Sequence, residues 1–381
     1  MFFAKNFDGL GPVRLGEQKE KNVNSISRRN FLQTAAAGLS ALPALGRGAF
    51  AAEPLKVGFI FLGPIGDYGW TWAHNKGRLA MDTALKGQVV SSYVENVKED
   101  ASAVPILKDL AQNGSQLIFT TSYGYMDQTI EVAKQFPKVM FEHCTGYKHA
   151  DNVGTYNSRF HQGRAVEGTI AGLMSKSGTI GYLGSYKVPE VVLGVNSFTL
   201  SAQAVNPNIK TKLVMIDSWF DPAKEAAAVQ TLINLGCDVV AQHTDSPAGL
   251  QVCEQRKVWC FGQGADMSRF APKTQATGIE DIWGPYYTSR AKAMLDGSWK
   301  PDDAWWGFKE GTVVMSPYNK VLPDNVKAAA DKIIAGWKDG AYDVFTGPIA
   351  DQDGKERVTK GQRMEDKDLA VIDWYVKGVQ S

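Results

Sequence analysis

The hydrophobic positions after Pro54 fall into two alternating patterns. Short runs rich in β-branched and aromatic residues predict strands at Lys56–Leu62, Val89–Val97, Gln116–Thr121, Lys138–Cys144, Thr179–Leu183, Lys212–Ile216, Asp238–His243 and Val258–Phe261. Amphipathic stretches between these runs predict helices at Ala103–Gln112, Gln128–Gln135, Gln162–Lys176 and Pro222–Leu235. Strands that alternate with helices form parallel sheets with helices on both faces, so the pattern predicts an α/β protein. A length of 381 residues allows two such sheets.

Two segments share the order helix, glycine, strand. One is VPILKDLAQNGSQLIFTTS, around Pro105–Ser122, and the other is AAAVQTLINLGCDVVAQHT, at Ala226–Thr244. They indicate one structural unit used in two successive lobes, although a common turn between helix and strand gives the same likeness.

Extended segments that could cross between two lobes are predicted at 152–160, 277–282 and 311–316. Three crossings make a hinged protein in which neither lobe is continuous in sequence. We therefore expect one lobe from residues 55–155 plus 280–313, and the other from 156–279 plus 314–381.

The first 51 residues have the pattern of an export signal. Adjacent arginines, Arg28 and Arg29, precede a mild apolar run at Thr34–Leu45 and an A-x-A site at 49–51. The arginine pair is similar to a twin-arginine signal, and the run is too short to span a bilayer. We expect residues 1–51 to be removed and the mature protein to be periplasmic. No cysteine lies at the cleavage site, so lipid anchoring is not indicated.

Composition narrows the class of partner. The formal net charge is +1, which gives no field that would attract nucleic acid or an anionic membrane. Ten Trp and thirteen Tyr exceed the needs of a core and offer flat surfaces for a ligand. The four cysteines, Cys144, Cys237, Cys253 and Cys260, are expected as buried free thiols, and no spacing of Cys and His resembles a metal site.

Loops after the predicted strands combine aromatic and acidic residues. In parallel sheets, ligands bind outside the carboxyl ends of strands, where helix N-termini also point. The segments at these ends are GPIGDYGWTW, SYGYMD, DSWFDP, TDSP, GQGAD and EDIWG. Rings that stack and carboxylates that accept hydrogen bonds suit a flat, uncharged ligand with N–H or O–H groups.

Several of these residues have a purely structural interpretation as well. Asp221 before Pro222 is expected to cap a helix, and Asp245 is expected either to do the same or to bind the ligand. Trp219 is better explained by ligand stacking. Trp305 and Trp306 are expected in a loop rich in Pro and Asp, with at least one of them in packing between the lobes or at the surface. Lys309 is expected either to be solvated or to donate to a ligand oxygen.

Catalytic and nucleotide-binding motifs are missing from the sequence. It contains no G-x-S-x-G, no H-E-x-x-H and no G-x-x-x-x-G-K-[ST]. This pattern favours a binding protein over an enzyme, and no cofactor is expected.

The segments GDYGWTWAHNKGR, SWFDPAKE, QHTDSP, FGQGADMS and FKEGTV together, in this order, resemble the basic-membrane-protein (BMP) family. Its members are exported substrate-binding proteins of ABC importers, related to purine nucleoside receptors. The likeness covers residues 55–381. It implies a type I periplasmic binding fold, with two doubly wound parallel-sheet lobes joined by three crossovers that close on a small molecule.

The resemblance also implies site residues. The base would stack between Trp70 and Trp219, with Thr71 next to the first ring. The base edge would meet Asp127, Tyr123 or Tyr125, and a ribose would meet Asp281 and Lys309, with a glycine at Gly262 or Gly264. Trp72 is expected in packing, and Asp67 either caps the turn or touches the ligand.

Tryptophans replace the phenylalanines usual in nucleoside receptors and leave less room for a sugar. The expected ligand is therefore a purine base such as adenine, or else a purine nucleoside, delivered to an ABC permease. The alternatives are an exported nucleoside-processing enzyme and a ligand-sensing module that docks on a membrane receptor.

Overall fold

The computed structural model describes residues 53–66 and 68–381. The expected signal peptide at 1–51 and the position of Asp67 lie outside the described residues. Within them, no helix is both long and apolar enough to cross a bilayer.

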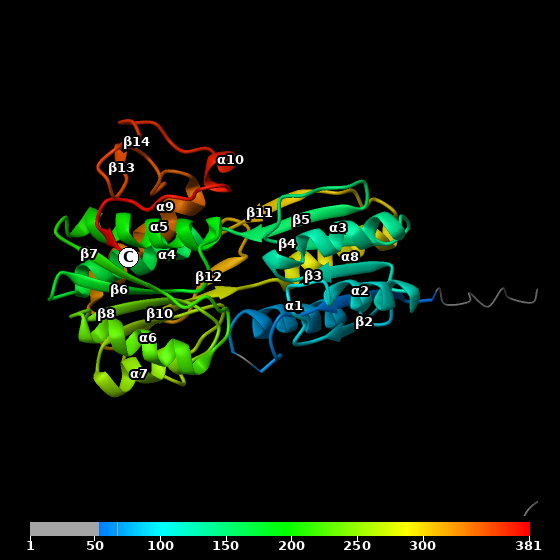
Figure 1. Ribbon diagram of the computed structural model, residues 1–381, viewed down its shortest axis with the longest axis horizontal. Coiled ribbons are helices and arrows are strands. Elements are labelled where there is room, and N and C mark those ends of the chain that lie inside the picture. The colour runs from blue at the N-terminus through cyan, green and yellow to red at the C-terminus, as the bar shows by residue number, and fades with distance from the viewer. Residues whose placement is uncertain (1–52, 67) are drawn as a thin grey trace, which may run out of the picture. The chain divides into compact units, whose positions relative to one another are not determined.

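The first sheet is entirely parallel (Figure 1). Its spatial order is β11 (Asp303–Trp306), β5 (Val153–Ser158), β4 (Met140–Cys144), β3 (Leu117–Thr120), β1 (Leu55–Ile60) and β2 (Val89–Val94). It is covered by α1 (Trp70–Ala84), α2 (Ala103–Gln112), α3 (Met126–Gln135) and α8 (Gly284–Asp296), with a short 3-10 turn, η1 (Tyr123–Tyr125), before α3. We call this sheet and its helices lobe 1.

Alternate residues of β1 explain how lobe 1 buries both faces of its sheet. Phe59 and Phe61 point into the core shared with α1 and α8, whereas Ile60 points into the core under α2 and α3. Successive side chains of a strand face opposite ways, so a strand buried on both faces needs an unbroken apolar run. LKVGFI supplies that run in β1, apart from the exposed Lys56.

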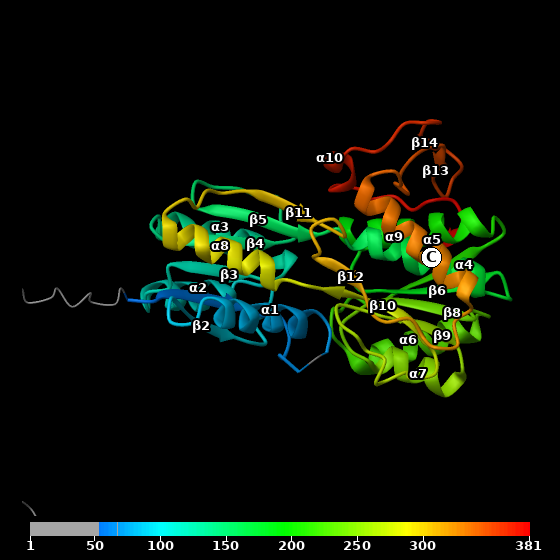
Figure 2. The same cartoon turned by 180° about the vertical axis from the view of Figure 1, so that it is seen from behind.

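The second sheet is parallel except for one edge pair (Figure 2). Its order is β12 (Val313–Met315), β10 (Gln275–Asp281), β9 (Trp259–Gly262), β8 (Val239–His243), β6 (Thr179–Gly184), β7 (Lys210–Met215) and β15 (Val379–Gln380), with β12 antiparallel to β10. Its helices are α4 (Phe160–Met174), α5 (Pro189–Val205), α6 (Pro222–Asn234), α7 (Ala248–Arg256) and α9 (Asp324–Asp339). We call this unit lobe 2.

The chain passes between the two sheets after β5, after β10 and after β11. The first sheet takes strands from residues 55–158 and 303–306, and the second takes them from 179–281, 313–315 and 379–380. These passages coincide with the segments expected to cross between lobes. The residue boundaries proposed for the lobes stay a prediction.

One expectation about these passages was wrong. Trp305 and Trp306 lie in strand β11, which pairs with β5, and not in a loop. The Pro and Asp residues before them suggested a loop, but pairing with β5 satisfies the backbone and overrides that local signal.

The remaining elements follow α9. They are β13 (Ile349–Ala350), β14 (Glu356–Val358) and α10 (Asp366–Leu369), and the two strands form an antiparallel hairpin. The side chain of Asp221 accepts the N–H of Lys224, as expected for a helix cap. All four cysteines are buried free thiols, in agreement with their sequence context.

We predict that Glu142→Ala lowers the free energy of unfolding by about 3–5 kcal/mol, because it leaves a cation buried without its partner. Glu142 in β4 is fully buried and accepts hydrogen bonds from Tyr286 (2.7 Å), Trp299 (2.7 Å) and Arg290 (2.5 Å). Chemical denaturation measures the loss. The exposed Glu131→Ala is the control, with an expected change within about 0.5 kcal/mol. A loss below about 1 kcal/mol for Glu142→Ala would contradict the prediction.

Candidate functional site

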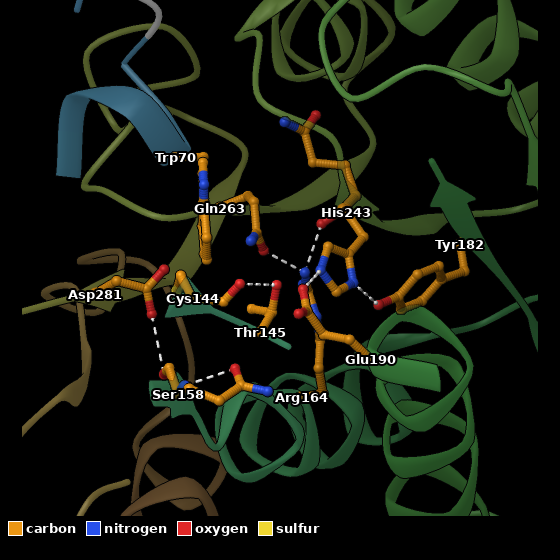
Figure 3. Close-up of polar contacts among 12 residues, drawn as sticks. Trp70, Cys144, Thr145, Ser158, Arg164, Tyr182, Glu190, His243, Gln263 and Asp281 are labelled. Carbon is orange, nitrogen blue, oxygen red and sulfur yellow. Dashed lines mark hydrogen bonds and ion pairs between the residues drawn. The ribbon is translucent and has the colours of Figure 1, made fainter. Parts of the chain in front are cut away.

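A cavity lies where the carboxyl ends of strands from both lobes meet (Figure 3). The residues of its wall lie at the carboxyl ends of parallel strands or in the segments that follow them, as expected for a ligand site in open α/β sheets. Lobe 1 contributes Leu62, Trp70, Ser122, Tyr123 and Thr145, and lobe 2 contributes Glu190, Trp219, His243, Asp245 and Gln263.

The cavity is a narrow space. The space between its lining atoms is about 340 Å³, a figure that includes space open to solvent. Small-molecule sites are typically about 300–1,000 Å³, so this cavity suits a small ligand.

Trp70 is held firmly at the first turn of α1. Its indole N–H donates to the carbonyl of Thr121 (2.5 Å), and the residue is only 9% exposed. Behind it, the rings of His74 (centroids 4.3 Å apart, 77°) and Trp283 (5.7 Å, 79°) meet it at a steep angle. The ring is therefore fixed before any ligand arrives, which lowers the entropy lost on stacking.

Trp219 lies on the lobe 2 side of the same cavity. Its ring contacts Tyr186 (5.4 Å) and His243 (6.5 Å) at tilted angles, and its carbonyl accepts the N–H of Asp245 (2.9 Å). Its indole N–H reaches across to Glu99 of lobe 1 (3.1 Å). The two tryptophans thus belong to different lobes and wall one cavity.

Two buried acids lie around this space. The Ser158 hydroxyl donates to Oδ1 of Asp281 (3.3 Å), while Oδ2 has no hydrogen-bond partner among the described residues. Burial, with the nearby charge of Glu190, raises the pKa of Asp281 well above its usual value. Figure 3 shows Asp281 on the Trp70 side of the space and Glu190 on the side of His243.

Glu190 contacts His243, with 3.3 Å between Oε1 and Nε2. Burial raises the pKa of Glu190 to about 8, although the charge of Arg164 opposes the shift. Burial also lowers the pKa of His243 well below its ordinary value. Both shifts favour the neutral forms, so the contact joins a carboxyl group and an imidazole that are both mostly uncharged at pH 7 and is not a strong ion pair.

A buried arginine orients Gln263 at the back of the cavity. Arg164 is fully buried and donates to Glu167 (2.6 Å), to the carbonyl of Gln242 (2.8 Å) and to Oε1 of Gln263. Because the amide oxygen of Gln263 is engaged, its amide nitrogen is the group that can donate to a ligand. The cavity thus offers ring faces, carboxyl groups and an amide donor.

Four residues expected at the site line this cavity: Trp70, Tyr123, Trp219 and Asp245. Asp245 is not a helix cap, since α7 begins at Ala248 after Pro247. Asp281 and Gly264 line a different groove, beside α1 and α8.

Other expected residues lie elsewhere. Thr71 is buried, and its hydroxyl accepts the N–H of Gly63, so it supports the loop. Tyr125 was expected at the edge of the base, but it is fully buried in the core under α2 and α3 and donates to the carbonyl of Val97. Lys309 was expected either solvated or at a ribose; it is exposed after β11 and is not part of the cavity wall. Asp127 pairs with Lys148 at the surface.

Trp72 separates from Trp70 in the structure. Its ring packs on Tyr68 (5.0 Å, 30°), and it borders the groove that also contains Gly264. This agrees with its expected packing role.

Sequence reasoning missed Glu190, His243, Gln263 and Thr145. The signal was present for three of them. Glu190 follows the end of β6, as the other site residues follow the ends of their strands. His243 stands in QHTDSP beside the expected Asp245, and Gln263 stands in FGQGADMS beside the expected Gly264.

A second chamber adjoins the cavity. The two share Tyr123, Thr145 and Glu190 as walls, and the space inside the chamber is about 1050 Å³, a figure that includes space open to solvent. It continues toward Asn157, His161 and other residues near the β5–α4 passage and α10. The described residues hold no group of His, Cys, Asp or Glu arranged for a metal ion.

The chain is similar to known proteins over most of its length. The sequence model of a family described as ABC transporter substrate-binding protein PnrA-like matches residues 55–339. A purine-binding protein of Brucella abortus (strain 2308) is 52% identical over 335 residues, which cover 88% of this chain and 95% of that protein. A candidate ABC transporter glucose-binding protein of Haloferax volcanii is 32% identical over 293 residues, which cover 76% and 74%.

Solved structures agree on the fold. An ABC transporter solute-binding protein from Aeropyrum pernix K1 superposes with a TM-score of 0.67 at 14% sequence identity, covering 83% of this chain and 97% of that one. With the two parallel-sheet lobes, this likeness confirms the predicted type I periplasmic binding fold.

We predict that Glu190 makes the protein less stable as pH rises from 5 to 8. An acid whose pKa is raised to about 8 in the folded protein keeps its proton there, while the unfolded chain releases it from about pH 4.5. The unfolded chain then binds fewer protons, so stability falls through this window. Relative to Glu190→Gln, the wild-type melting temperature should drop by about 3 °C or more across it. Parallel curves for wild type and variant would contradict this assignment, and Glu131→Gln is the control.

Proposed function

Because the chain belongs to the family of PnrA-like ABC transporter substrate-binding proteins, we propose that it captures a purine for an ABC importer. The ligand is a purine base, adenine-like, or a purine nucleoside. The single observation that carries the proposal is that Trp70 and Trp219 line one narrow cavity from different lobes. The 52% identity to a purine-binding protein supports the same class.

Stacking supplies part of the affinity. A flat heterocycle between two indole faces gains about 0.5–1.5 kcal/mol for each ring beyond the burial of area. Micromolar binding needs about −8 kcal/mol, so polar contacts and desolvation must supply the rest.

The polar groups fit the edge of a purine. Oδ2 of Asp281 has no partner among the described residues, so it can donate an O–H when the acid is protonated or accept an N–H when it is ionised. The neutral acid of Glu190 can donate to a ring nitrogen, and the amide nitrogen of Gln263 can donate as well. A purine presents both N–H donors and ring-nitrogen acceptors, and these buried groups would be left unpaired by an apolar ring.

The proposed mechanism is closure of the lobes around the stacked ring, followed by docking of the closed form on a permease. Export by the twin-arginine route and a periplasmic location are part of the same proposal. A nucleoside-processing enzyme would reveal itself by turnover of adenosine, and a sensing module by a receptor partner.

We predict that Trp70→Ala and Trp219→Ala each weaken adenine binding at least about tenfold, since each removes one stacking face and its buried area. Calorimetry measures the dissociation constants. Trp72→Phe is the matched control and should bind within about twofold of wild type, because Trp72 lies outside the cavity wall. Unchanged affinity in both alanine variants would rule out the sandwich.

We also predict that adenine and adenosine bind and that glucose does not, since a sugar has no aromatic face to stack on the two indole rings. Adenine is expected to bind more tightly, because the cavity that the tryptophans line is small and the ribose of adenosine would have to enter the adjoining chamber. Calorimetry with the three compounds, and native mass spectrometry of freshly purified protein, measure the preference. Tight binding of glucose without binding of adenine would contradict the proposed purine ligand. It would favour a sugar ligand instead, as the name of the Haloferax volcanii relative suggests.

A further inference from the structure

Glu99 joins three parts of the site with one carboxylate. It lies half-buried in the segment between β2 and α2 of lobe 1. Its Oε1 accepts the hydroxyl of Ser122 (2.6 Å) and the N–H of Gly124 (2.8 Å), both after β3. Its Oε2 accepts the indole N–H of Trp219 from lobe 2 (3.1 Å).

We propose that Glu99 is a positioning residue that orients the Trp219 wall and couples stacking on that wall to closure of the lobes. The inference rests on the proposed function in one respect only, that Trp219 stacks on the ligand. Glu99 itself is not part of the cavity wall, so it acts through Trp219 and Ser122.

The two carboxylate oxygens of Glu99 accept hydrogen bonds from different lobes. Oε1 holds the carboxylate to its own lobe, through two donors that follow β3. Close packing adds to this, since a Cβ at Gly124 would lie 2.6 Å from the Cβ of Glu99. The carboxylate is therefore fixed in lobe 1, and Oε2 presents a fixed acceptor to lobe 2.

The indole nitrogen of Trp219 can only donate, so it requires an acceptor. Hydrogen bonds to a carboxylate are shorter and stronger than those between neutral groups. This bond crosses between the lobes, and it must break when they separate. Closure of the lobes therefore forms the bond and orients the ring. A ligand that stacks on the oriented ring favours the closed form for the same reason.

Two other contacts between the lobes do not involve the ring of Trp219. Arg269 donates to the hydroxyl of Tyr68 (3.0 Å) at an exposed position. Gly69 approaches the backbone of Asp245 so closely that a Cβ there would lie 2.4 Å from the carbonyl oxygen. Among the interlobe contacts described here, the Glu99 bond is made by the ring that walls the cavity.

Glu99→Gln offers a selective test. A glutamine has one acceptor oxygen, which can keep the donors of Ser122 and Gly124, and its NH₂ then faces the indole N–H of Trp219. The variant removes the bond between the lobes and keeps the bonds within lobe 1. Trp219→Phe removes the same bond from the other side and keeps an aromatic face.

The readout is the dissociation rate of adenine in stopped-flow fluorescence. We expect each variant to accelerate dissociation about five- to tenfold and the double variant no more than either alone, because both delete one bond. Association rates should change less than about twofold. Glu131→Gln, on the exposed face of α3, is the control. Unchanged rates, or effects that multiply in the double variant, would overturn the proposal.

A distance measurement separates this inference from the ligand class. Spin labels are placed at exposed positions 134 and 251, one in each lobe. The distance between them, measured by pulsed electron paramagnetic resonance, reports closure of the lobes. Glu99→Gln should shift the distribution toward longer distances, both with adenine and without added ligand. If wild type binds neither adenine nor adenosine, the purine proposal fails. The distances measured without ligand in wild type and in Glu99→Gln then still test whether Glu99 holds the lobes together. Identical distributions for wild type and Glu99→Gln would overturn its role.

Discussion

The burial of both faces of two parallel sheets is the constraint on which the rest of the structure depends. Helices cover each sheet on both sides, so its faces are occupied by apolar side chains such as Phe59 and Ile60. Polar and aromatic groups that must reach a ligand are left with the carboxyl ends of the strands. Because the chain passes between the sheets three times, the strand ends of both lobes meet at one cavity.

The cavity combines rigid and adjustable parts. Trp70 is fixed by a hydrogen bond to Thr121 and by the rings behind it, so its lobe provides a wall that does not need to be ordered on binding. Trp219 is fixed partly by its own lobe and partly by Glu99 of the other, so its position depends on whether the lobes are together. One ring is thus in place before closure, and the other is placed by closure, as suits a protein that closes on its ligand.

The buried acids show how the same low-dielectric environment shapes the chemistry. Burial favours the neutral forms of Glu190 and His243, so their 3.3 Å contact joins two mostly uncharged groups near pH 7. Arg164, by contrast, keeps its charge because Glu167 and two further acceptors surround it. Neutral groups at the ligand and a paired charge behind them suit an uncharged heterocycle, because no unpaired ion must be desolvated when it binds.

The sequence by itself determined the alternation of strands and helices, the two lobes and the strand ends at which Trp70, Trp219 and Asp245 stand, because periodicity and strand polarity are local properties of the chain. It could not separate Tyr125, which is buried under α2 and α3, from its cavity neighbour Tyr123. Only the tertiary structure decided that Glu190 meets His243 and that Glu99 meets Trp219. Those residues are far apart along the chain, and their roles exist only where folding brings an acceptor within hydrogen-bond distance of a donor.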